Sequence, residues 1–486
     1  MAFFVHPAPP SCPGLAAQFS LLADGTKTFH SYRNLLSMSS VRTKVVGLLV
    51  SAFLVTQNFT GSSLDTGMSW KFMYDNSAIK PTLVKEMNAM RTTLTRPAET
   101  YSPIYFLASL GTGGLTVTFF MWLMHWIRHP GRTVPVFEDI AAAFTAGGMM
   151  ARMMIIIAVA GIAFYAFLNI KYLIWNLIHF RSWKRTEAYV RVRNSDTETQ
   201  LLAMPLALAM SVNVVFIIGM VFMPGLWQVV EYLFPLALIA FAVIGIMAFG
   251  MLGNFFGRVL AVGGFSCAVN NSFSQALPAF ALSMIGVGLA APAGLSATPL
   301  VAGIGLILST FFLVATLLIG AIALVLGMRS MMENGANIET APTLSIFIPL
   351  LTVISILSLR QHHSLGVHFA LESAAGDRLM MLSQFLSVQL LFALLTWVVL
   401  KRLGYASRFI FGCDASVGSY ALVCPGVALA VMIHFWLNRG LVDAGMMTKF
   451  STGYWAISSI AIAIQSLTIW LVYKLNRKHF GVPKPA

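Results

Sequence analysis

Residues 299–327 read PLVAGIGLILSTFFLVATLLIGAIALVLG and contain no charged side chain. An α-helix needs about 20 predominantly apolar residues to cross a bilayer, so this stretch is long enough to span one. The whole chain of 486 residues has the same character, since 58% of its residues are hydrophobic and 10% are charged, whereas about 25% are charged in a soluble domain. The sequence therefore predicts an all-α polytopic membrane protein, and it argues against a water-soluble enzyme, a disordered chain or a fibrous protein.

Similar apolar segments lie on both sides of this stretch. Their connections are mostly short, so segments that are neighbours in sequence should pack as antiparallel hairpins. The ten predicted transmembrane helices are 103–127, 149–178, 201–223, 226–253, 273–292, 299–327, 343–359, 379–400, 417–437 and 450–473.

The chain before these helices has a different composition. Residues 1–43 contain four prolines and no helical period, which predicts a flexible N-terminus. Residues 44–60 form a short apolar, membrane-associated segment, compatible with a signal-anchor, an interfacial helix or an extra span. Residues 61–100 are polar and of mixed charge, and we expect them outside the bilayer. The ten-helix pore domain is then expected over 101–475, and a cytoplasmic tail over 476–486.

Basic residues predict the orientation, because cytoplasmic loops of membrane proteins are enriched in lysine and arginine. If the chain enters the first of the ten spans from the cytoplasm, 14 basic residues lie inside and 6 lie outside. Those inside are Arg181, Lys184, Arg185, Arg191, Arg193, Arg258, Arg329, Lys401, Arg402, Arg408, Lys474, Arg477, Lys478 and Lys484. Those outside are Arg128, Arg132, Arg360, Arg378, Arg439 and Lys449.

We therefore expect an integral protein of a bacterial inner (plasma) membrane with its C-terminus in the cytoplasm. The net charge of +14 is attributed to loops that face the cytoplasm and anionic lipid, and not to binding of nucleic acid. A span at 44–59 would conflict with this orientation, since it would place the extreme N-terminus outside with Arg33 and Arg42 beside the membrane.

Prolines recur on every second predicted helix, and the last four are 73, 71 and 76 residues apart. Proline removes a backbone donor and kinks a helix, and freed backbone in a membrane is tolerated where it lines a cavity. This pattern predicts five hairpins whose proline-bearing helices surround a central pore. The alternative is that proline is common in membrane helices and the spacing is coincidental. The predicted helix-kink residues are Pro103, Pro205, Pro278, Pro349 and Pro425.

The same five helices carry hydroxyl and amide side chains but almost no acidic ones. Such a lining offers donors to an anion without holding it in a deep ion pair, as conduction requires. Alternatively, the polar groups join helices through interhelical hydrogen bonds. The predicted pore-lining residues are Thr112, Thr116, Ser211, Asn213, Ser274, Gln275, Thr352, Ser419 and Cys424.

Two local patterns carry a resemblance to a known family. They are SLGTGG at 109–114 and GSYALVCP at 418–425. With the alternating prolines, they resemble the tellurite-resistance/dicarboxylate transporter family, which includes plant slow anion channels, bacterial tellurite-resistance channels and fungal sulfite and malate transporters. The resemblance covers about residues 100–475. It implies five inner helices around a pore, five outer helices, a homotrimer, and passage of anions, in several members past a phenylalanine that blocks the pore.

The chain departs from this family in two ways. Its first 100 residues go beyond the minimal bacterial pattern, and Cys424 precedes Pro425 where the family's gating phenylalanine would stand. Cys424 is therefore predicted at or near the narrowest part of the path, which is either wider there or closed by another aromatic residue. The candidates for that residue are Phe119, Phe216, Phe280 and Phe347.

The function predicted from these features is a membrane channel or carrier for small anions, of the sulfite, other oxyanion, halide or dicarboxylate class. Expected partners are the anion, membrane lipid and further copies of the chain. The alternative is a quinone- or haem-binding membrane subunit of a redox enzyme, with His125, His179 and His434 as candidate haem ligands.

Other chemistry finds little support in the sequence. His362, His363, His368, Glu372 and Asp377 share one predicted outer loop, but they lack the paired spacing of a metal site, so a solvated loop is expected. No glycine-rich phosphate loop and no Ser/His/Asp arrangement occurs. We therefore expect no catalytic residue, no metal and no cofactor.

Overall fold

The structure is a computed structural model that describes residues 98–268, 270–371 and 374–480. The features expected for residues 1–97 and for the tail beyond residue 480 lie outside this description. The chain divides into the units Met1–Thr93 and Leu94–Ala486, and only the second is discussed. All regular structure in the described ranges is helical, and ten helices are long and apolar enough to cross a membrane. The prediction of an all-α polytopic membrane protein is confirmed.

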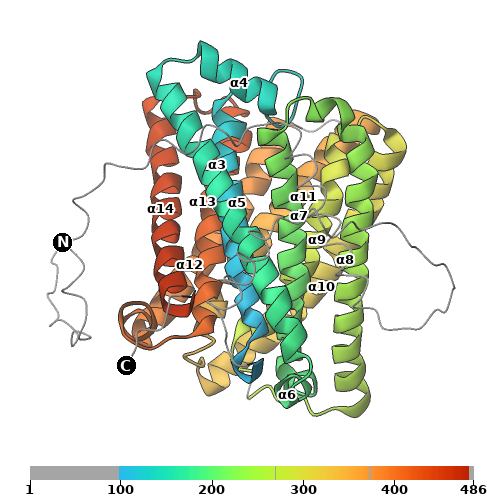
Figure 1. Ribbon diagram of the computed structural model, residues 1–486, viewed down its shortest axis with the longest axis vertical. Coiled ribbons are helices and arrows are strands. Elements are labelled where there is room, and N and C mark those ends of the chain that lie inside the picture. Colours follow the sequence, from blue (N-terminus) through green and yellow to red (C-terminus); the bar gives the residue numbers. More distant parts are fainter. Residues whose placement is uncertain (1–97, 269, 372–373, 481–486) are drawn as a thin grey trace, which may run out of the picture. The chain divides into compact units, whose positions relative to one another are not determined.

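Each span contains one long helix (Figure 1). These are α3 (Phe106–Trp126), α5 (Met149–Trp183), α7 (Ala203–Phe222), α8 (Leu226–Val262), α9 (Leu277–Leu295), α10 (Pro299–Asn334), α11 (Phe347–His368), α12 (Ala375–Arg402), α13 (Val423–Phe435) and α14 (Thr452–Phe480). Two shorter helices, α4 (Phe137–Ala146) and α6 (Glu187–Arg193), lie outside the spans. Several helices run past their predicted ends: α8 and α11 each end nine residues later, and α14 continues to residue 480 beyond the predicted boundary at 475.

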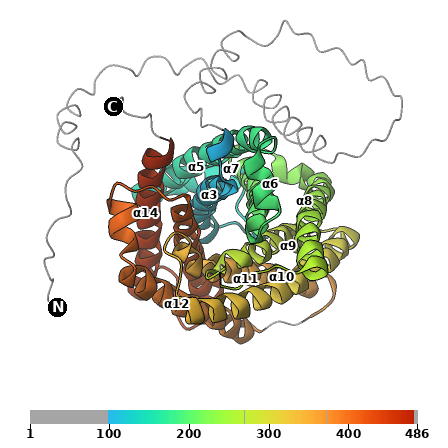
Figure 2. The ribbon, with the colours of Figure 1, turned by 90° about the horizontal axis from the view of Figure 1, so that it is seen from below.

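The spans form two groups that alternate along the chain. In the most apolar stretch of each odd-numbered span, 72% to 94% of the residues are buried, against 22% to 39% in the even-numbered spans. The helices of the odd spans close a ring in which α3 packs on α7, α7 on α9, α9 on α11, α11 on α13, and α13 on α3. Figure 2 looks along the helices and shows α5, α8, α10, α12 and α14 outside this inner ring.

Helix α10 shows how an outer helix attaches to the ring. Its buried residues are mostly small and recur every three or four positions, so they form one stripe that packs against α9. At Gly305 a Cβ atom would lie 2.9 Å from the carbonyl oxygen of Leu289 and 3.0 Å from the amide nitrogen of Ala293. The opposite face exposes large apolar side chains, as expected for contact with lipid, among them Ile307, Leu318 and Val325.

Glycines also allow close contact between α3 and α13, which are neighbours in the inner ring. A Cβ atom at Gly111 would lie 2.6 Å from a methyl group of Val423, and one at Gly114 would lie 2.8 Å from a methyl group of Val427. The SLGTGG stretch therefore serves as a contact surface, because only residues without a side chain allow this approach.

Four of the five alternating prolines stand at a change of helix type. Pro205, Pro278, Pro349 and Pro425 are the second or third residue of the α-helical part of their spans, and short 3₁₀ segments precede them. Proline suits the first turn of an α-helix, where its missing N–H is not needed. The distortion is thus a switch from 3₁₀ to α geometry, not a bend in mid-helix. Pro103 differs, since it opens a 3₁₀ turn three residues before α3 begins.

Candidate functional site

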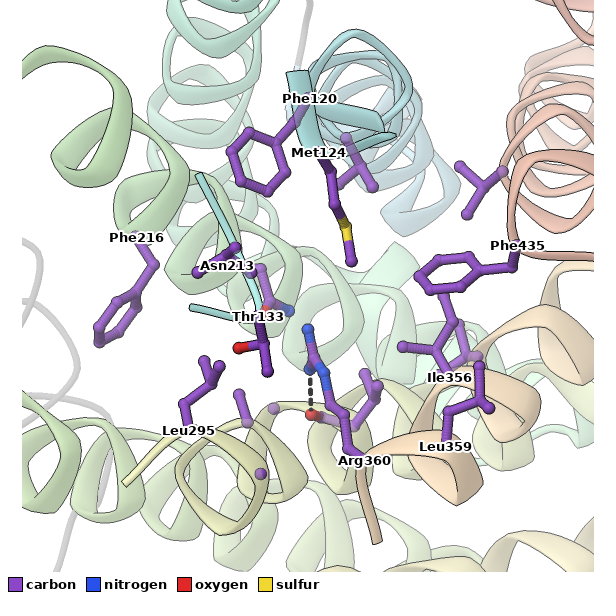
Figure 3. Close-up of a pocket in the computed structure, with 18 of the residues that line it drawn as sticks. Phe120, Met124, Thr133, Asn213, Phe216, Leu295, Ile356, Leu359, Arg360 and Phe435 are labelled. Carbon is purple, nitrogen blue, oxygen red and sulfur yellow. Dashed lines mark hydrogen bonds between the residues drawn. The ribbon is translucent and has the colours of Figure 1, made fainter. Parts of the chain in front are cut away.

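A cavity of about 950 Å³ lies within the inner ring and is bordered by all five of its helices. It occupies the half of the ring toward the C-terminal ends of these helices, where the loop 131–134 also borders it. Figure 3 shows part of its lining, which is mostly apolar. Labelled apolar residues include Phe120, Met124, Leu295, Ile356 and Phe435.

Arg360, on α11, is the charged residue that reaches deepest into this apolar surrounding (Figure 3). Its Nη1 atom donates a hydrogen bond of 2.7 Å to the carbonyl oxygen of Val287 on α9. The polar side chains of Thr133 and Asn213 border the same cavity. The hydrogen bond fixes the guanidinium group at the cavity wall and leaves its other N–H groups for a further acceptor.

The other arginines that border the cavity have acidic partners. Arg132 hydrogen-bonds to both carboxylate oxygens of Asp139, and Arg378 and Arg439 lie 3.8 and 3.6 Å from a carboxylate oxygen of Asp443. In the described ranges no carboxylate lies within 4.0 Å of the Arg360 guanidinium group. A charge without a counter-ion is costly inside a membrane protein, so the position of Arg360 is unusual for a basic residue within a span.

Charges outside the spans respond to the same surroundings. The hydrogen bond from Arg132 to Asp139 raises the pKa of the arginine above its ordinary value and keeps it charged. Partial burial, followed by repulsion from Arg439 and Arg128, lowers the pKa of Lys449. Positive charges are therefore crowded around Arg439, which borders the cavity.

A second, smaller cavity of about 80 Å³ lies toward the N-terminal ends of the inner helices. Both cavities are bordered by Phe280 on α9, Pro349 on α11 and Cys424 on α13. These three residues therefore lie between the two cavities and separate them. Phe280 and Cys424 are buried, with 3% and 8% of their surface exposed.

Four of the nine predicted pore-lining residues border a cavity. Asn213, Thr352 and Cys424 border the large one, and Ser274 and Cys424 border the small one. Thr352 also ties three helices together, because it donates to the carbonyl oxygen of Ala428 and accepts from the amide of Gln389.

The other five predicted residues border neither cavity: Thr112, Thr116, Ser211, Gln275 and Ser419. The hydroxyl groups of Thr112 and Ser211 donate hydrogen bonds to carbonyl oxygens four residues earlier in their own helices. Such local hydrogen bonds satisfy a hydroxyl group without any ligand. Gln275 instead donates to the backbone of Asp196, and the Ser419 hydroxyl lies 2.7 Å from that of Tyr405.

Arg360 corrects an expectation from the sequence, which placed it in an outer loop. Helix α11 continues to His368, so Arg360 lies within the span. A signal was present in the spacing, because Thr352, Ile356, Arg360 and His363 follow one another at intervals of three or four residues on one helical face. All four border the large cavity.

Two of the candidate haem ligands are neighbours. The rings of His125 and His434 are 6.2 Å apart, and both side chains are buried. Phe435 packs on His125 at 5.6 Å and Trp126 packs on His434 at 5.9 Å, so the two histidines belong to an aromatic cluster. His179 lies elsewhere, beside Tyr101 and Trp175.

The histidines at the end of α11 take part in helix contacts. His362 is hydrogen-bonded to the carbonyl oxygen of Ser358, and His368 to that of Ser296. No cluster of three or more His, Cys, Asp or Glu side chains suitable for a metal occurs in the part of the chain that the structure describes. Glu372 lies outside that part.

Comparison of the chain with protein-family models, curated proteins and solved structures finds no match. What the fold establishes is the class, a ten-span helical membrane protein with two concentric rings of helices. The family resemblance continues to rest on the two sequence patterns and the prolines.

Proposed function

We propose that the protein is a channel or carrier for anions, and that Arg360 binds the anion on its way through the inner ring. The observation that supports this most directly is the guanidinium group of Arg360, which borders a mostly apolar cavity and has no carboxylate within 4.0 Å among the described residues. Ionisable residues within spans are rare and usually functional. An anion would neutralise this charge. It would also accept hydrogen bonds from the N–H groups of Arg360 that do not bind Val287.

The arrangement of the two cavities supports a path. They lie end to end along the inner ring and are separated by a short barrier of Phe280, Pro349 and Cys424. An apolar constriction of this kind blocks ions by excluding water, and movement of one side chain opens it. In this proposal Phe280 is the blocking aromatic residue. The small side chain of Cys424 leaves room for the Phe280 ring.

The charges around the cavity support the choice of anions over cations. Four arginines and two histidines border it, whereas Asp443 is the one acidic lining residue among those that the structure describes. Asp443 pairs with Arg378 and Arg439, so the net charge of the mouth is positive. A positively charged entrance raises the local concentration of anions and repels cations.

The side of entry follows from the charge count in the sequence. The cytoplasmic end is proposed to be the one that carries Arg258, Lys401 and Arg402, at the N-terminal ends of the inner helices. The large cavity then opens away from the cytoplasm and the small one toward it.

The test is chloride and sulfite flux from proteoliposomes that contain the wild type, Arg360→Gln or Arg360→Lys. Loss of the charge should reduce flux by at least about tenfold. A tenfold change in rate corresponds to roughly 1.4 kcal/mol. This is a modest share of the charge–charge interaction energy expected in such a site. Lysine keeps the charge and should retain a larger part of the flux than glutamine. Equal flux in all three folded proteins would overturn the proposal.

A further inference from the structure

The large cavity is not confined to the inner ring, because it reaches the outer helix α8. Five α8 residues border it, spaced three or four apart so that they form one helical face, and all five are apolar. We call this face the α8 wall. It consists of Trp227, Val230, Phe234, Ala237 and Phe241.

Contacts on either side of the α8 wall show that the extension passes between inner helices. Helix α8 packs on both α7 and α9, and Phe216 and Ile217 of α7 and Pro292 and Leu295 of α9 border the same space. A Cβ atom at Gly288 would collide with the ring of Phe241, so the glycine lets the α8 wall come close to α9. The cavity thus has an axial part and an apolar side arm.

Arg360 lies close to this side arm. It is hydrogen-bonded to Val287 on α9, the helix that forms one side of the arm. The site therefore combines one cationic group with an extended apolar surface. A small inorganic anion would lose its hydration on entering and gain contacts at one end only. An anion with an apolar body would also bury that body against the arm.

Size and charge narrow the ligand further. A volume of about 950 Å³ is at the upper end of the range of about 300–1,000 Å³ that is usual for pockets of drug-sized molecules. Of the four arginines at the cavity, Arg360 is the one without an acidic partner in the described part of the chain. A single guanidinium group without a carboxylate within 4.0 Å, as far as the described ranges extend, matches a single anionic group.

We propose that the physiological substrate is an organic monoanion, with a single carboxylate or sulfonate head held by Arg360 and an apolar body lodged against the α8 wall. This inference rests on the proposed function and specifies its substrate class. Inorganic anions would then pass as poorer substrates. Dianions would be disfavoured because, in the described ranges, Arg360 is the cavity arginine with no carboxylate within 4.0 Å, whereas Arg378 and Arg439 share Asp443.

The probes are sulfonates, because they stay charged and do not cross lipid in a neutral form. Purified full-length protein is titrated calorimetrically with methanesulfonate, benzenesulfonate, 1,3-benzenedisulfonate and the neutral benzenesulfonamide. Benzenesulfonate should bind about tenfold or more tighter than methanesulfonate, since the ring adds buried apolar surface. The disulfonate and the sulfonamide should bind more weakly than benzenesulfonate, and Arg360→Gln should abolish the preference for the charged form.

A second variant tests the arm without touching Arg360. Ala237→Leu fills the α8 wall and should weaken benzenesulfonate binding several-fold more than methanesulfonate binding. Ala242→Leu adds the same volume at a residue of α8 that does not border the cavity, and it should change neither.

The outcomes separate this inference from the proposed function. Equal binding of methanesulfonate and benzenesulfonate, with chloride or sulfite flux that depends on Arg360, would overturn the substrate class and leave the anion path intact. Tight binding of benzenesulfonamide irrespective of Arg360 would also overturn it, and would favour a neutral ligand such as a quinone. Absence of flux of chloride, sulfite and benzenesulfonate alike would overturn both proposals.

Discussion

The inner and outer rings overlap in mean hydropathy, at 1.5 to 2.4 and 1.7 to 2.7 for their most apolar stretches, but they differ in what their residues contact. Mean hydropathy of the most apolar stretch is 1.7 in the span of α9 and 2.7 in that of α10, yet 94% of the former and 28% of the latter is buried. Outer spans such as those of α12 and α14, at 1.8 and 1.7, are no more apolar than the inner ones. Hydropathy therefore identifies the spans, whereas the positions of small and polar residues decide which ring a span joins.

Charged residues show the same contrast between the two rings. Arg258 on outer helix α8 lies near its end and pairs with Glu198 at 3.3 Å, and Arg329 on α10 is exposed and pairs with Glu333 at 2.8 Å. Arg360, on an inner helix, borders an enclosed cavity and pairs with neither of these acids nor any other described one. Outer helices in the described ranges also carry basic residues without a carboxylate within 4.0 Å, Lys171 of α5 among them, so Arg360 is set apart by its place at the cavity.

The largest effect is expected from Cys424→Phe, which adds an aromatic ring on the inner ring between the two cavities. Phe280 and Pro349 already border this place, so the larger side chain should close the barrier and lower anion flux by about tenfold or more. Cys424→Ala is the matched control and should keep the flux. Flux in the Phe variant at the level of the wild type would show that Cys424 does not border the path.

Phe280→Ala should act in the opposite direction and less strongly. Removing the ring joins the two cavities, so flux should rise by roughly several-fold, within the range of a lowered barrier of about 1 kcal/mol. The measurement is the initial rate of chloride efflux from proteoliposomes. Phe347→Ala serves as control, because Phe347 borders neither cavity; a rise in both variants would indicate a general loosening of the ring.

Substitution of two glycines of α10 by alanine should distinguish the face that contacts the inner ring from the face that contacts lipid, because the two changes in stability should have opposite signs. At Gly305 a Cβ atom would crowd α9 backbone, so Gly305→Ala should lower stability by about 1–3 kcal/mol. At Gly303 no atom lies within 4 Å, so Gly303→Ala should raise stability by up to about 1 kcal/mol through helix propensity. Thermal unfolding in detergent compares the two; a loss of equal size at both positions would contradict the assigned α10 face.

The smallest effect concerns the charge of Lys449, which lies near Arg439 of the cavity lining. Because its pKa is lowered by burial and by Arg439 and Arg128, the lysine loses its proton at lower pH than usual as pH rises. Anion uptake should therefore fall on the alkaline side, by less than about twofold at physiological salt, where charges are screened beyond about 8 Å. Lys449→Gln should lack this part of the pH dependence, and an unchanged pH profile in the variant would contradict the assignment.

The sequence predicted the ten spans and their class because bilayer thickness sets a length of apolar helix that is visible in the residues. The burial of the odd spans follows from the prolines, since proline is tolerated where neighbouring helices surround the backbone. Neither inference required knowledge of how each helix is rotated about its own axis.

The site was predictable only in part because it depends on that rotation. Thr112 and Asn213 look alike as polar residues of inner helices, yet Thr112 turns to its own backbone and Asn213 borders the cavity. Arg360 was taken for a loop residue because polar residues near the end of α11 lower its mean hydropathy. In a helix end that faces a cavity, such residues do not mark the membrane surface.

The most direct test of the account is to locate an anion at Arg360. Crystals of the full-length protein grown in bromide should give an anomalous peak within hydrogen-bonding distance of the Arg360 guanidinium group, and Arg360→Gln should lose it. Exposed Arg329, which has its own acidic partner, should show none. Bromide at Arg329 or in the bulk only, with none at Arg360 in the wild type, would contradict the claim that the inner ring holds an unpaired charge for an anion.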